Sequence, residues 1–424
     1  MGACCGGCCG SGDFDDDYAK FVDANTSSTQ ESGPPVSLSD FELLRVIGRG
    51  TYGKVMQVRK KTTGDLYAMK VMKKSDIVMR NQVKHTLTER NVLQSVRHPF
   101  IVTMHYAFQS REKLYLVMSL QSGGELFFHL RRERTFNEGR VRLYGAEIVL
   151  ALQELHRHDV VYRDLKPENI LLDAEGHVCL SDFGLAKEAV TSLDNGASTF
   201  CGTPSYMAPE VCEAQRDARN SRRNSRNSPT RRSPCAQVLL GTGHSFPVDW
   251  WSFGTLLYEM LVGAPPFYSR NLHSMYRAIL YGELKLPNAL PRTARALLEG
   301  LLRREPAQRL GSAGDAEQVR KQQFFRPLDF RKVLARAYVP EFRPSLLSAA
   351  DTTNFDSTFT DENPTDSVGN LPPGARAGDV SGLTEADDDA DVENGASNSL
   401  FAGWESFSRR RAAEPGEPTA TAGV

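Results

Sequence analysis

No apolar run in the 424-residue sequence reaches the roughly 18 residues that a membrane-spanning helix needs, so we expect no transmembrane helix. The N-terminus also lacks the apolar stretch of a secretory signal. An excess of one charge is missing as well, because 51 Lys and Arg residues balance 52 Asp and Glu residues. This balance argues against a nucleic-acid-binding protein, which would need a basic excess. Without a secretory route, we expect the eight cysteines to be reduced thiols in the cytoplasm.

Polar segments flank and interrupt a chain whose average composition is that of a soluble globular protein. Residues 1–40 are small, polar and acidic, and we expect them to form a flexible tail that buries no core. Residues 216–235 hold seven arginines and a single acid, and residues 361–396 are rich in Pro, Gly and acids. Both segments are too polar to pack, so we expect both to be disordered.

Local patterns predict a strand-rich part followed by a helix-rich part. Alternating β-branched and apolar residues predict antiparallel strands over 41–47, 54–59, 66–72 and 113–118. Further on, apolar residues recur three and four positions apart, as on one face of a helix: Val141, Tyr144, Ile148, Leu152 and Leu155. Residues 250–262 are apolar on nearly every side, which predicts a buried helix capped by Asp249 and followed by Gly263. This order of elements predicts an α+β fold with two lobes.

A glycine-rich segment, Gly48-x-Gly50-x-x-Gly53-x-Val55, lies between two predicted strands. A dinucleotide-binding fold places its glycines between a strand and a helix, so that fold is not indicated. Between two strands, glycines let the backbone approach the phosphates of a nucleoside triphosphate. A plain glycine-rich hairpin turn is the alternative for this motif taken alone.

Charged residues at defined positions indicate phosphate chemistry. Lys70 follows on the third predicted strand, and Glu89, in the predicted helix 83–96, is our candidate for the acid that holds this lysine in place. Three motifs then occur in order, YRDLKPEN at 162–169, SDFG at 181–184 and APE at 208–210.

The motif residues suit the transfer of a phosphoryl group. Asp164 can accept the proton of an attacking hydroxyl, and Lys166 can steady the moving phosphoryl group. Asn169 and Asp182 carry hard oxygen ligands that suit Mg²⁺. The alternative, surface loops that contain these residues by chance, would require several ordered coincidences.

With these motifs, residues 41–325 resemble the catalytic domain of protein kinases, in the group related to protein kinases A, G and C. Residues 248–252 and 354–360 most resemble ribosomal-protein S-six-type kinases and protein kinase B (Akt). The resemblance implies a small antiparallel β-sheet lobe with one regulatory helix over 41–120 and a mainly helical lobe over 121–325. It also implies a C-terminal extension with a hydrophobic motif over 326–410, with disordered segments over 212–238 and 411–424.

The resemblance implies a serine/threonine protein kinase that uses ATP and Mg²⁺, acts on protein substrates and is activated by an upstream kinase. We expect a monomer without a nucleic-acid partner. The alternative is a membrane-tethered pseudokinase scaffold without phosphotransfer. Pseudokinases typically lack the strand lysine, the catalytic acid or a metal ligand, whereas all four residues are present here: Lys70, Asp164, Asn169 and Asp182.

Further roles carry over from the resemblance, residue by residue. The implied ATP-binding positions are Ile47, Gly48, Gly50, Gly53, Val55, Ala68, Lys70, Glu89, Met118, Glu125 and Asp182. Of these, Val55 and Ala68 cover the adenine, and Met118 gates its pocket beside a hinge at 119–121. Glu210 matches an acid that pairs with a buried arginine, here Arg309. The activation-loop phosphoacceptor and its cationic partners match Thr199, Arg163, Lys187 and His85.

Three acids match positions at which relatives hold substrate arginines two and three residues before the phosphoacceptor: Glu125, Glu168 and Glu259. We therefore expect a preference for substrates with basic residues there, because carboxylates pair strongly with guanidinium groups. The alternative is that Glu125 contacts the ribose and that Glu259 faces solvent.

The first residues of the chain indicate acylation. Gly2 and the small uncharged residues after it predict N-myristoylation, although Gly6 stands where Ser or Thr is preferred. One myristoyl chain binds membranes only marginally, and the acids at 13–17 exclude a polybasic second signal. We therefore expect a membrane-associated cytoplasmic protein, with palmitoylation at Cys4, Cys5, Cys8 or Cys9. A metal site at the Cys-x-x-Cys pattern is the alternative.

Residues 401–407 (FAGWESF) resemble the hydrophobic motif that relatives dock on their own small lobe. Trp404 replaces the usual Phe, and one residue too many precedes the last aromatic. Either Glu405 supplies a permanent charge or Ser406 is phosphorylated. Ser367 matches the turn-motif phosphoacceptor, although valine follows it instead of proline. An ordinary disordered tail is the alternative.

The Arg/Ser-rich segment 216–235 holds a serine, Ser225, that follows arginines at the positions expected of substrates. We expect this segment to occupy the substrate groove or to be phosphorylated by a neighbouring molecule. The alternative is a solvated surface loop, since long insertions cost little closure entropy.

Overall fold

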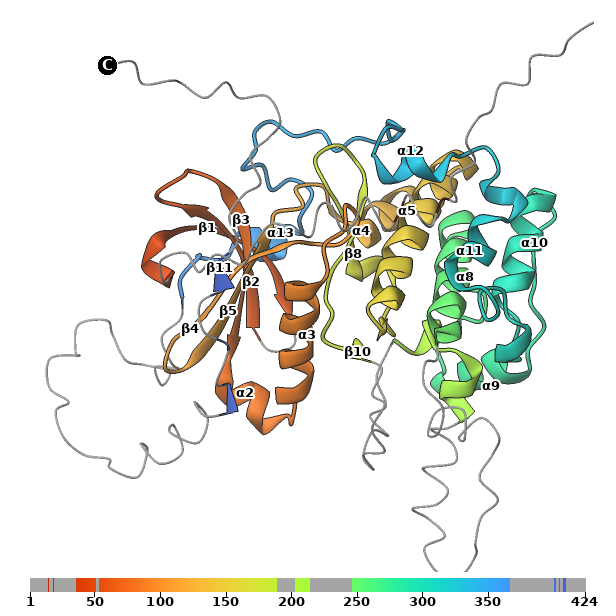
Figure 1. Ribbon diagram of the computed structural model, residues 1–424, viewed down its shortest axis with the longest axis horizontal. Coiled ribbons are helices and arrows are strands. Elements are labelled where there is room, and N and C mark those ends of the chain that lie inside the picture. Colours follow the sequence, from red (N-terminus) through yellow and green to blue (C-terminus); the bar gives the residue numbers. More distant parts are fainter. Residues whose placement is uncertain are drawn as a thin grey trace, which may run out of the picture.

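The computed structural model of the protein describes residues 14, 18, 36–50, 53–188, 203–213, 246–366, 400, 401, 404 and 407–408. A β-sheet lobe built from 41–119 lies beside a helical lobe built mainly from 126–334 (Figure 1). The predicted two-lobed α+β fold is therefore confirmed. Among the described residues, no helix is both long and apolar enough to cross a bilayer.

The small lobe is an antiparallel sheet whose described strands follow the order β1-β2-β3-β5-β4-β11. The strands are β1 (Phe41–Gly50), β2 (Gly53–Lys60), β3 (Leu66–Lys73), β4 (Met104–Gln109), β5 (Lys113–Ser119) and β11 (Phe407–Ser408). Strands β1, β2, β3 and β5 confirm the four runs predicted from alternation. The sequence pattern does not predict β4, and β11 comes from the far C-terminal part of the chain.

Two helices follow β3 in the small lobe, α2 (Lys74–Met79) and α3 (Val83–Ser95). Helix α3 confirms the predicted helix 83–96 and buries Glu89. Aromatic rings fill one side of the sheet, where Phe41 and Tyr67 cluster and Phe108 stacks on Tyr115 with ring centroids 4.7 Å apart. This apolar packing fixes the sheet that carries the glycine-rich hairpin.

The large lobe consists mainly of helices. These are α4 (Leu126–Glu133), α5 (Glu138–Arg157), α8 (Pro247–Val262), α9 (Leu272–Tyr281), α10 (Arg292–Leu301), α11 (Asp315–Arg320) and α12 (Phe330–Leu334). Short strands form two small sheets. In one, β7 (Val160–Val161) pairs with β10 (Lys187–Glu188); in the other, β8 (Ile170–Leu172) lies between β6 (Gly124–Glu125) and β9 (Val178–Leu180) and pairs with both. Short 3₁₀ helices lie at Leu38–Asp40, Pro167–Asn169, Pro204–Tyr206, Pro306–Gln308 and Gln323–Phe325. The predicted apolar face of α5 is buried.

Helix α8 is buried along nearly its whole length, as its apolar sequence predicts. The helix begins at Pro247, however, so the prediction that Asp249 caps it is wrong. Asp249 lies in the first turn and accepts hydrogen bonds from backbone groups of another segment instead. Gly263 follows the helix with φ of 93°, a left-handed conformation that ends helices and favours glycine.

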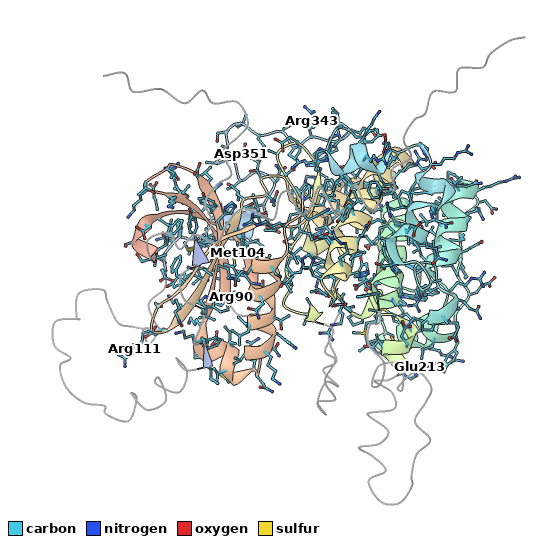
Figure 2. All side chains as sticks on the ribbon, in the orientation of Figure 1. Arg90, Met104, Arg111, Glu213, Arg343 and Asp351 are labelled. Carbon is cyan, nitrogen blue, oxygen red and sulfur yellow. The ribbon has the colours of Figure 1, made fainter. Side chains whose placement is uncertain are left out.

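A C-terminal extension returns from the large lobe to the small lobe along one edge of the molecule, where Arg343 and Asp351 mark its path (Figure 2). It includes the short helix α13 (Ser357–Thr360), which packs near β1. Ion pairs hold the extension on the small lobe, Arg49–Glu362 at 2.7 Å and Lys113–Asp366 at 2.6 Å. The extension therefore covers the small lobe, as the resemblance implies.

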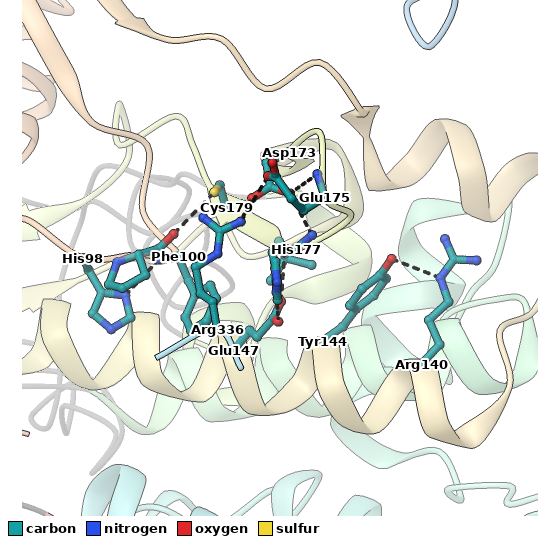
Figure 3. A network of polar contacts seen from close by, with 12 residues as sticks. His98, Phe100, Arg140, Tyr144, Glu147, Asp173, Glu175, His177, Cys179 and Arg336 are labelled. Atoms are coloured by element: carbon teal, nitrogen blue, oxygen red, sulfur yellow. Dashed lines mark hydrogen bonds and ion pairs between the residues drawn. The ribbon is translucent and has the colours of Figure 1, made fainter. Parts of the chain in front are cut away.

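A polar network ties α5 to the β8–β9 hairpin and to the extension (Figure 3). Glu147 of α5 accepts a hydrogen bond from Val178 N at 2.9 Å and lies 2.6 Å from His177 Nδ1. Asp173, which follows β8, pairs with Arg336 of the extension. The hairpin that leads to Asp182 is therefore fixed on two sides.

Three segments differ from the sequence expectation. The first six residues of 361–396, a segment expected to be disordered, belong to the described extension, where Glu362 and Asp366 form ion pairs with Arg49 and Lys113. Residues 1–40 are expected to bury no core, yet Tyr18 is 1% exposed, because its ring packs against α5 and its hydroxyl bonds there. The expected disordered segment 212–238 begins with a residue that folds, since Cys212 is buried. Several predicted sites lie outside the described residues: Gly2, Cys4, Cys5, Cys8, Cys9, Thr199, Ser225, Ser367, Glu405 and Ser406.

Candidate active site

The glycine-rich segment joins β1 to β2 as a hairpin, with Gly48 opposite Val55 and Gly50 opposite Gly53. A Cβ atom at Gly53 would lie 1.7 Å from the carbonyl oxygen of Val71 in β3, so only glycine fits there. The hairpin is therefore in the strand–turn–strand setting that the phosphate-binding hypothesis requires.

One face of the sheet carries the predicted ATP-contacting side chains. Val55 lies opposite Lys70, and Ala68 lies opposite Met118. Ala68 and Lys70 are two residues apart on β3, so their side chains point to the same face. Directly opposed residues also share a face, which brings all four side chains together. Ile47 is buried on the neighbouring strand β1.

Lys70 lies between two carboxylates. Its Nζ is 2.6 Å from Glu89 Oε1 of α3 and 3.5 Å from Asp182 Oδ1. Burial opposes the charge of Lys70, but Asp182 and Glu89 outweigh this effect, so the pKa of Lys70 is raised. Lys70 is in turn the main reason why the pKa of Asp182 is lowered. Both groups are therefore charged at neutral pH, and the lysine is available to neutralise phosphate oxygens.

Three polar side chains surround the Asp164 carboxylate. Its Oδ2 accepts hydrogen bonds from Lys166 Nζ at 2.7 Å and from Asn169 Nδ2 at 2.8 Å. Thr203 Oγ1 lies 3.4 Å from Asp164 Oδ1 and 3.2 Å from Lys166 Nζ. The sequence analysis missed Thr203, although it stands in the CGTP run between the predicted phosphoacceptor and the APE motif. The arrangement fixes the orientation of one carboxylate as a proton acceptor.

Asp249 of α8 holds the backbone of this catalytic loop. It accepts hydrogen bonds from the backbone N–H groups of Tyr162 and Arg163, both at 2.8 Å. His156 Nε2 lies 3.0 Å from Asp249. Burial opposes the charge of His156, but its bonds to Asp249 and Asp315 raise the pKa of His156 to about 9. Arg163 has φ of 66°, an uncommon conformation that these contacts impose.

Two side chains offer oxygen ligands for Mg²⁺. Asn169 donates through Nδ2 to Asp164, which leaves its Oδ1 for a metal. Asp182 has a side chain that is 53% exposed. Ser181, which precedes it, donates to the Asn169 carbonyl through N and Oγ at 2.9 and 3.0 Å, so the two segments are joined. Mg²⁺ usually takes one or two protein oxygens together with phosphate oxygens and water, so this donor set fits Mg²⁺ bound with a nucleoside triphosphate.

Among the three acids predicted to bind substrate arginines, the charge of Glu168 affects the ionisation of the other two. Burial raises the pKa of Glu125 and of Glu259, and the charge of Glu168 raises both further. Tyr206 donates a hydrogen bond to Glu259, which acts in the opposite direction. Glu168 Oε2 is buried without a hydrogen-bond partner among the described residues. Carboxylates gathered in this way favour a bound cation.

Two predicted partners of the activation-loop phosphoacceptor lie close together. Burial lowers the pKa of His85, and the positive charge of Arg163 lowers it further. Arg163 Nε also donates to the carbonyl oxygen of Leu185 at 2.7 Å, on the segment that leads toward Thr199. The side chain of Lys187 lies outside the described residues.

The hinge at 119–121 is supported from both sides. Ser119 Oγ lies 3.0 Å from His105 Nε2 of β4. Asn354 of the extension donates through Nδ2 to the carbonyl oxygen of Ser122 at 3.2 Å. Gly124 has φ of 72°, and a Cβ there would lie 2.2 Å from the Asn354 carbonyl oxygen. The sequence analysis did not predict this contact, because it joins residues far apart in the chain.

The predicted hydrophobic motif packs on the small lobe through Phe401 and Trp404, whose side chains are fully buried. Trp404 Nε1 donates to the carbonyl oxygen of Phe108 in β4 at 3.1 Å. Phe407 forms part of β11 and pairs with Ala107 of β4. The last aromatic of the motif therefore belongs to a strand at the edge of the sheet, and the extra residue before it lies outside the described residues.

Comparison with known proteins gives two matching families. Residues 41–325 match the family described as "Protein kinase domain", and residues 347–405 match the family described as "Protein kinase C terminal domain". The chain is similar to "Protein kinase 2" of Dictyostelium discoideum, with 50% identity over 329 residues that cover 78% of this chain and 62% of the relative.

Two further relatives are named serine/threonine-protein kinases. The chain is 46% identical over 340 residues to the "RAC family serine/threonine-protein kinase homolog" of Dictyostelium discoideum, which covers 80% of this chain and 70% of the relative. It is 48% identical to the "Serine/threonine-protein kinase gad8" of Schizosaccharomyces pombe, over 79% of this chain and 54% of the relative. The chain thus spans 54% to 70% of the length of these relatives.

Proposed function

Because the chain belongs to the protein kinase family, in the AGC group of serine/threonine kinases, we propose that it transfers the γ-phosphoryl group of ATP to serine and threonine hydroxyls of proteins. One observation carries the proposal. The Lys70–Glu89–Asp182 contacts and the ordered Asp164 carboxylate are formed together and joined through Asn169. A pseudokinase scaffold, the alternative, would not need this complete set.

The residues of the site divide the work of phosphoryl transfer. Asp164 accepts the proton of the substrate hydroxyl, and two donors on its Oδ2 keep the carboxylate in one orientation. Lys70 and Lys166 place positive charge where the phosphates and the transferring group lie. Mg²⁺, which Asn169 and Asp182 would hold, neutralises charge on the phosphate oxygens when it is bound.

A phosphate-incorporation assay with the purified full chain, ATP, Mg²⁺ and an arginine-containing peptide tests the proposal. Asp164→Asn removes the proton acceptor and should lower kcat by about 100-fold or more. Asp361→Asn, at an exposed acid of the extension, is the matched control and should keep the wild-type rate. A wild-type chain that transfers no phosphate under these conditions would sink the proposal.

The three gathered acids support a preference for substrates with arginine two and three residues before the phosphoacceptor. A carboxylate–guanidinium contact at a partly desolvated site contributes about 1.5–3 kcal/mol. Peptides with and without these arginines should differ by about tenfold or more in kcat/KM. Glu168→Gln should reduce this difference while leaving the rate on the arginine-free peptide unchanged. Equal rates on both peptides with the wild-type chain would contradict the preference.

Acylation at Gly2, with palmitoylation at Cys4 or Cys5, would place the chain at a membrane surface in the cytoplasm. The support is the sequence pattern alone, since these residues lie outside the described ones. Gly2→Ala should move the protein from the membrane fraction to the supernatant, whereas Ser11→Ala should not. An unchanged membrane fraction for Gly2→Ala would rule out acylation as the cause of membrane binding.

Phosphorylation of Thr199 by an upstream kinase would activate the monomeric chain, with Ser367 and Ser406 as further sites. The docked rings of Phe401 and Trp404 support regulation through the tail. Mass spectrometry of the active chain should detect phosphate at Thr199, and Thr199→Ala should lower kcat. Full activity of a chain that carries no phosphate at Thr199 would contradict this regulation.

A further inference from the structure

Two aromatic residues near the N-terminus, Phe14 and Tyr18, lie against the folded core, and we call them the N-terminal anchor. Both have helical backbone conformation, and their ring centroids lie 5.8 Å apart. Tyr18 is almost fully buried, and Phe14 is partly buried. The sequence around them is acidic, with Asp13 before Phe14 and three aspartates between the two rings. Neither family match covers these residues.

The anchor contacts the large lobe through α5, α11 and α12. The Tyr18 hydroxyl donates to Glu154 Oε2 at 3.0 Å and lies 3.3 Å from the Leu150 carbonyl oxygen. Arginines lie beside both rings, with Arg157 5.5 Å from the Tyr18 centroid and Arg320 4.1 Å from the Phe14 centroid. The Phe14 ring also lies edge-on to Phe330, 6.3 Å away. Arginines beside two rings whose neighbours in the sequence are aspartates argue that the site is built for this chain's own N-terminal residues.

The anchor also contacts the small lobe at the loop that follows α3. The Tyr18 ring centroid lies 6.1 Å from that of His98, and His98 lies 5.5 Å from Phe100, the residue shown beside it in Figure 3. The Phe100 carbonyl oxygen accepts a hydrogen bond from Leu180 N at 2.8 Å, and Val102 N donates to the Leu180 carbonyl oxygen at 2.9 Å.

These contacts connect the anchor with the active site. Leu180 ends β9 and stands two residues before Asp182, while the loop at 98–100 begins shortly after the helix that carries Glu89. Tyr18 therefore packs where the C-terminal end of α3 meets the strand that leads to Asp182. A packed ring at this junction restricts how α3 can move relative to the large lobe.

We propose that the N-terminal anchor is a positioning element of the kinase core: Phe14 and Tyr18 dock in cis on the α5–α11–α12 surface and hold the loop at 98–100, and through it α3 and Glu89, in the arrangement that pairs Lys70. The anchor touches no reacting group, so it acts through the Lys70–Glu89 contact. The inference rests on the proposed kinase function and adds a part of the chain that neither family match includes.

The test uses the full-length chain with both anchor rings removed, Phe14→Ala with Tyr18→Ala. Couplings between distant sites typically amount to about 5- to 150-fold. We expect kcat/KM for the peptide substrate to fall by about fivefold or more, mainly through kcat. A synthetic peptide of residues 10–24, added in excess, should bind the variant and restore kcat. The same peptide with alanine at both ring positions is the matched control and should do neither.

The outcomes separate positioning from mere stabilisation. Leu347→Ala, which removes an apolar side chain that is 94% exposed, is a control variant. It should keep the wild-type kcat and the wild-type KM for the peptide substrate. Restored kcat with the wild-type peptide supports the inference. Wild-type kcat in the double variant, or peptide binding that leaves a lowered kcat unchanged, would overturn it. If circular dichroism shows that the double variant does not fold, the single variant Tyr18→Ala replaces it. The peptide of residues 10–24 must then restore the kcat of Tyr18→Ala.

Failure of the proposed function gives a different result. A wild-type chain without phosphotransfer would refute the kinase proposal. Binding of the peptide of residues 10–24, carrying a fluorescent label, to the double variant is measured without ATP and so does not depend on that activity. Absence of that binding would overturn the anchor whatever the activity. Binding should also weaken as salt is raised, because Arg157 and Arg320 lie beside the two rings and the peptide carries aspartates next to these rings in its sequence.

Discussion

The buried pair between Glu210 and Arg309 offers a sharp test of what stabilises the large lobe. The Arg309 side chain is 0% exposed, and its two Nη atoms donate to the Glu210 carboxylate at 2.7 and 2.8 Å. Its remaining donors reach the carbonyl oxygens of Pro247, Arg303 and Arg304. The guanidinium group thus has a partner for each of its N–H bonds, which is the condition under which a buried charge is tolerated.

Glu210→Gln leaves the guanidinium charge buried without its counter-charge. Breaking a buried ion pair by removing one partner costs about 3–5 kcal/mol. In domains of this size each kcal/mol shifts Tm by about 2–4 °C, so we expect Tm to fall by roughly 6–20 °C. Because Arg309 also bonds the carbonyl oxygen of Pro247, where α8 begins, kcat should fall together with stability.

Scanning calorimetry of the full chain measures this effect. Glu299→Gln, at an exposed acid on α10, is the matched control and should melt within about 1–2 °C of the wild type. Glu210→Leu combined with Arg309→Met removes both charges and should recover much of the lost Tm, because the unpaired charge is what destabilises. A Glu210→Gln variant that melts with the control, or a double variant less stable than Glu210→Gln, would refute the reasoning.

Three further predictions concern contacts elsewhere in the fold. Trp404→Ala should undock the tail and lower kcat, whereas Trp404→Phe should lower kcat less. Protease cleavage after residue 366 would monitor docking of the tail. Equal cleavage of the wild type, Trp404→Ala and Trp404→Phe would contradict the prediction. Thr203→Val should lower kcat by about 10- to 100-fold without a change in Tm, since it loosens the Asp164 carboxylate. His156, with a pKa raised to about 9, stabilises the fold fully below its unfolded pKa of about 6.5 and loses this effect as pH rises through 9. The stability difference between wild type and His156→Gln, from urea unfolding, should therefore shrink between pH 6.5 and 9; a difference that grows would have the wrong sign.

Local sequence patterns suffice where burial follows from the chain's own periodicity. Helix α8 is predictable because residues 250–262 are apolar on nearly every side, and a helix of that kind is stable only when it is surrounded by other parts of the protein. The glycine-rich hairpin is predictable from glycines placed between two alternating runs. The Lys70–Glu89 pair is predictable because phosphate chemistry demands an acid beside the lysine, and α3 offers Glu89 on its buried side.

Contacts between distant segments leave no local pattern. Asp249 precedes an apolar run, as a helix cap would, but its carboxylate is taken by backbone N–H groups at 162 and 163. Strand β11 pairs with β4 across roughly 300 residues, so neither strand's sequence indicates the other. Tyr18 stands in an acidic stretch that predicts disorder, yet its ring and hydroxyl find buried partners on α5.

Segments from both ends of the chain converge on the few small-lobe elements around Glu89. Trp404 bonds the backbone of β4, Asp366 pairs with Lys113 at the start of β5, and Tyr18 packs on the loop between α3 and β4. The large lobe has its own buried helix and ion pair, whereas the small lobe gains part of its packing from these outside segments. Removing any one of them should therefore disturb the Lys70–Glu89 pair before the large lobe loses stability, so loss of kcat should precede loss of Tm. We therefore expect activity in this kinase core to depend on sequence far outside the motifs that identify it.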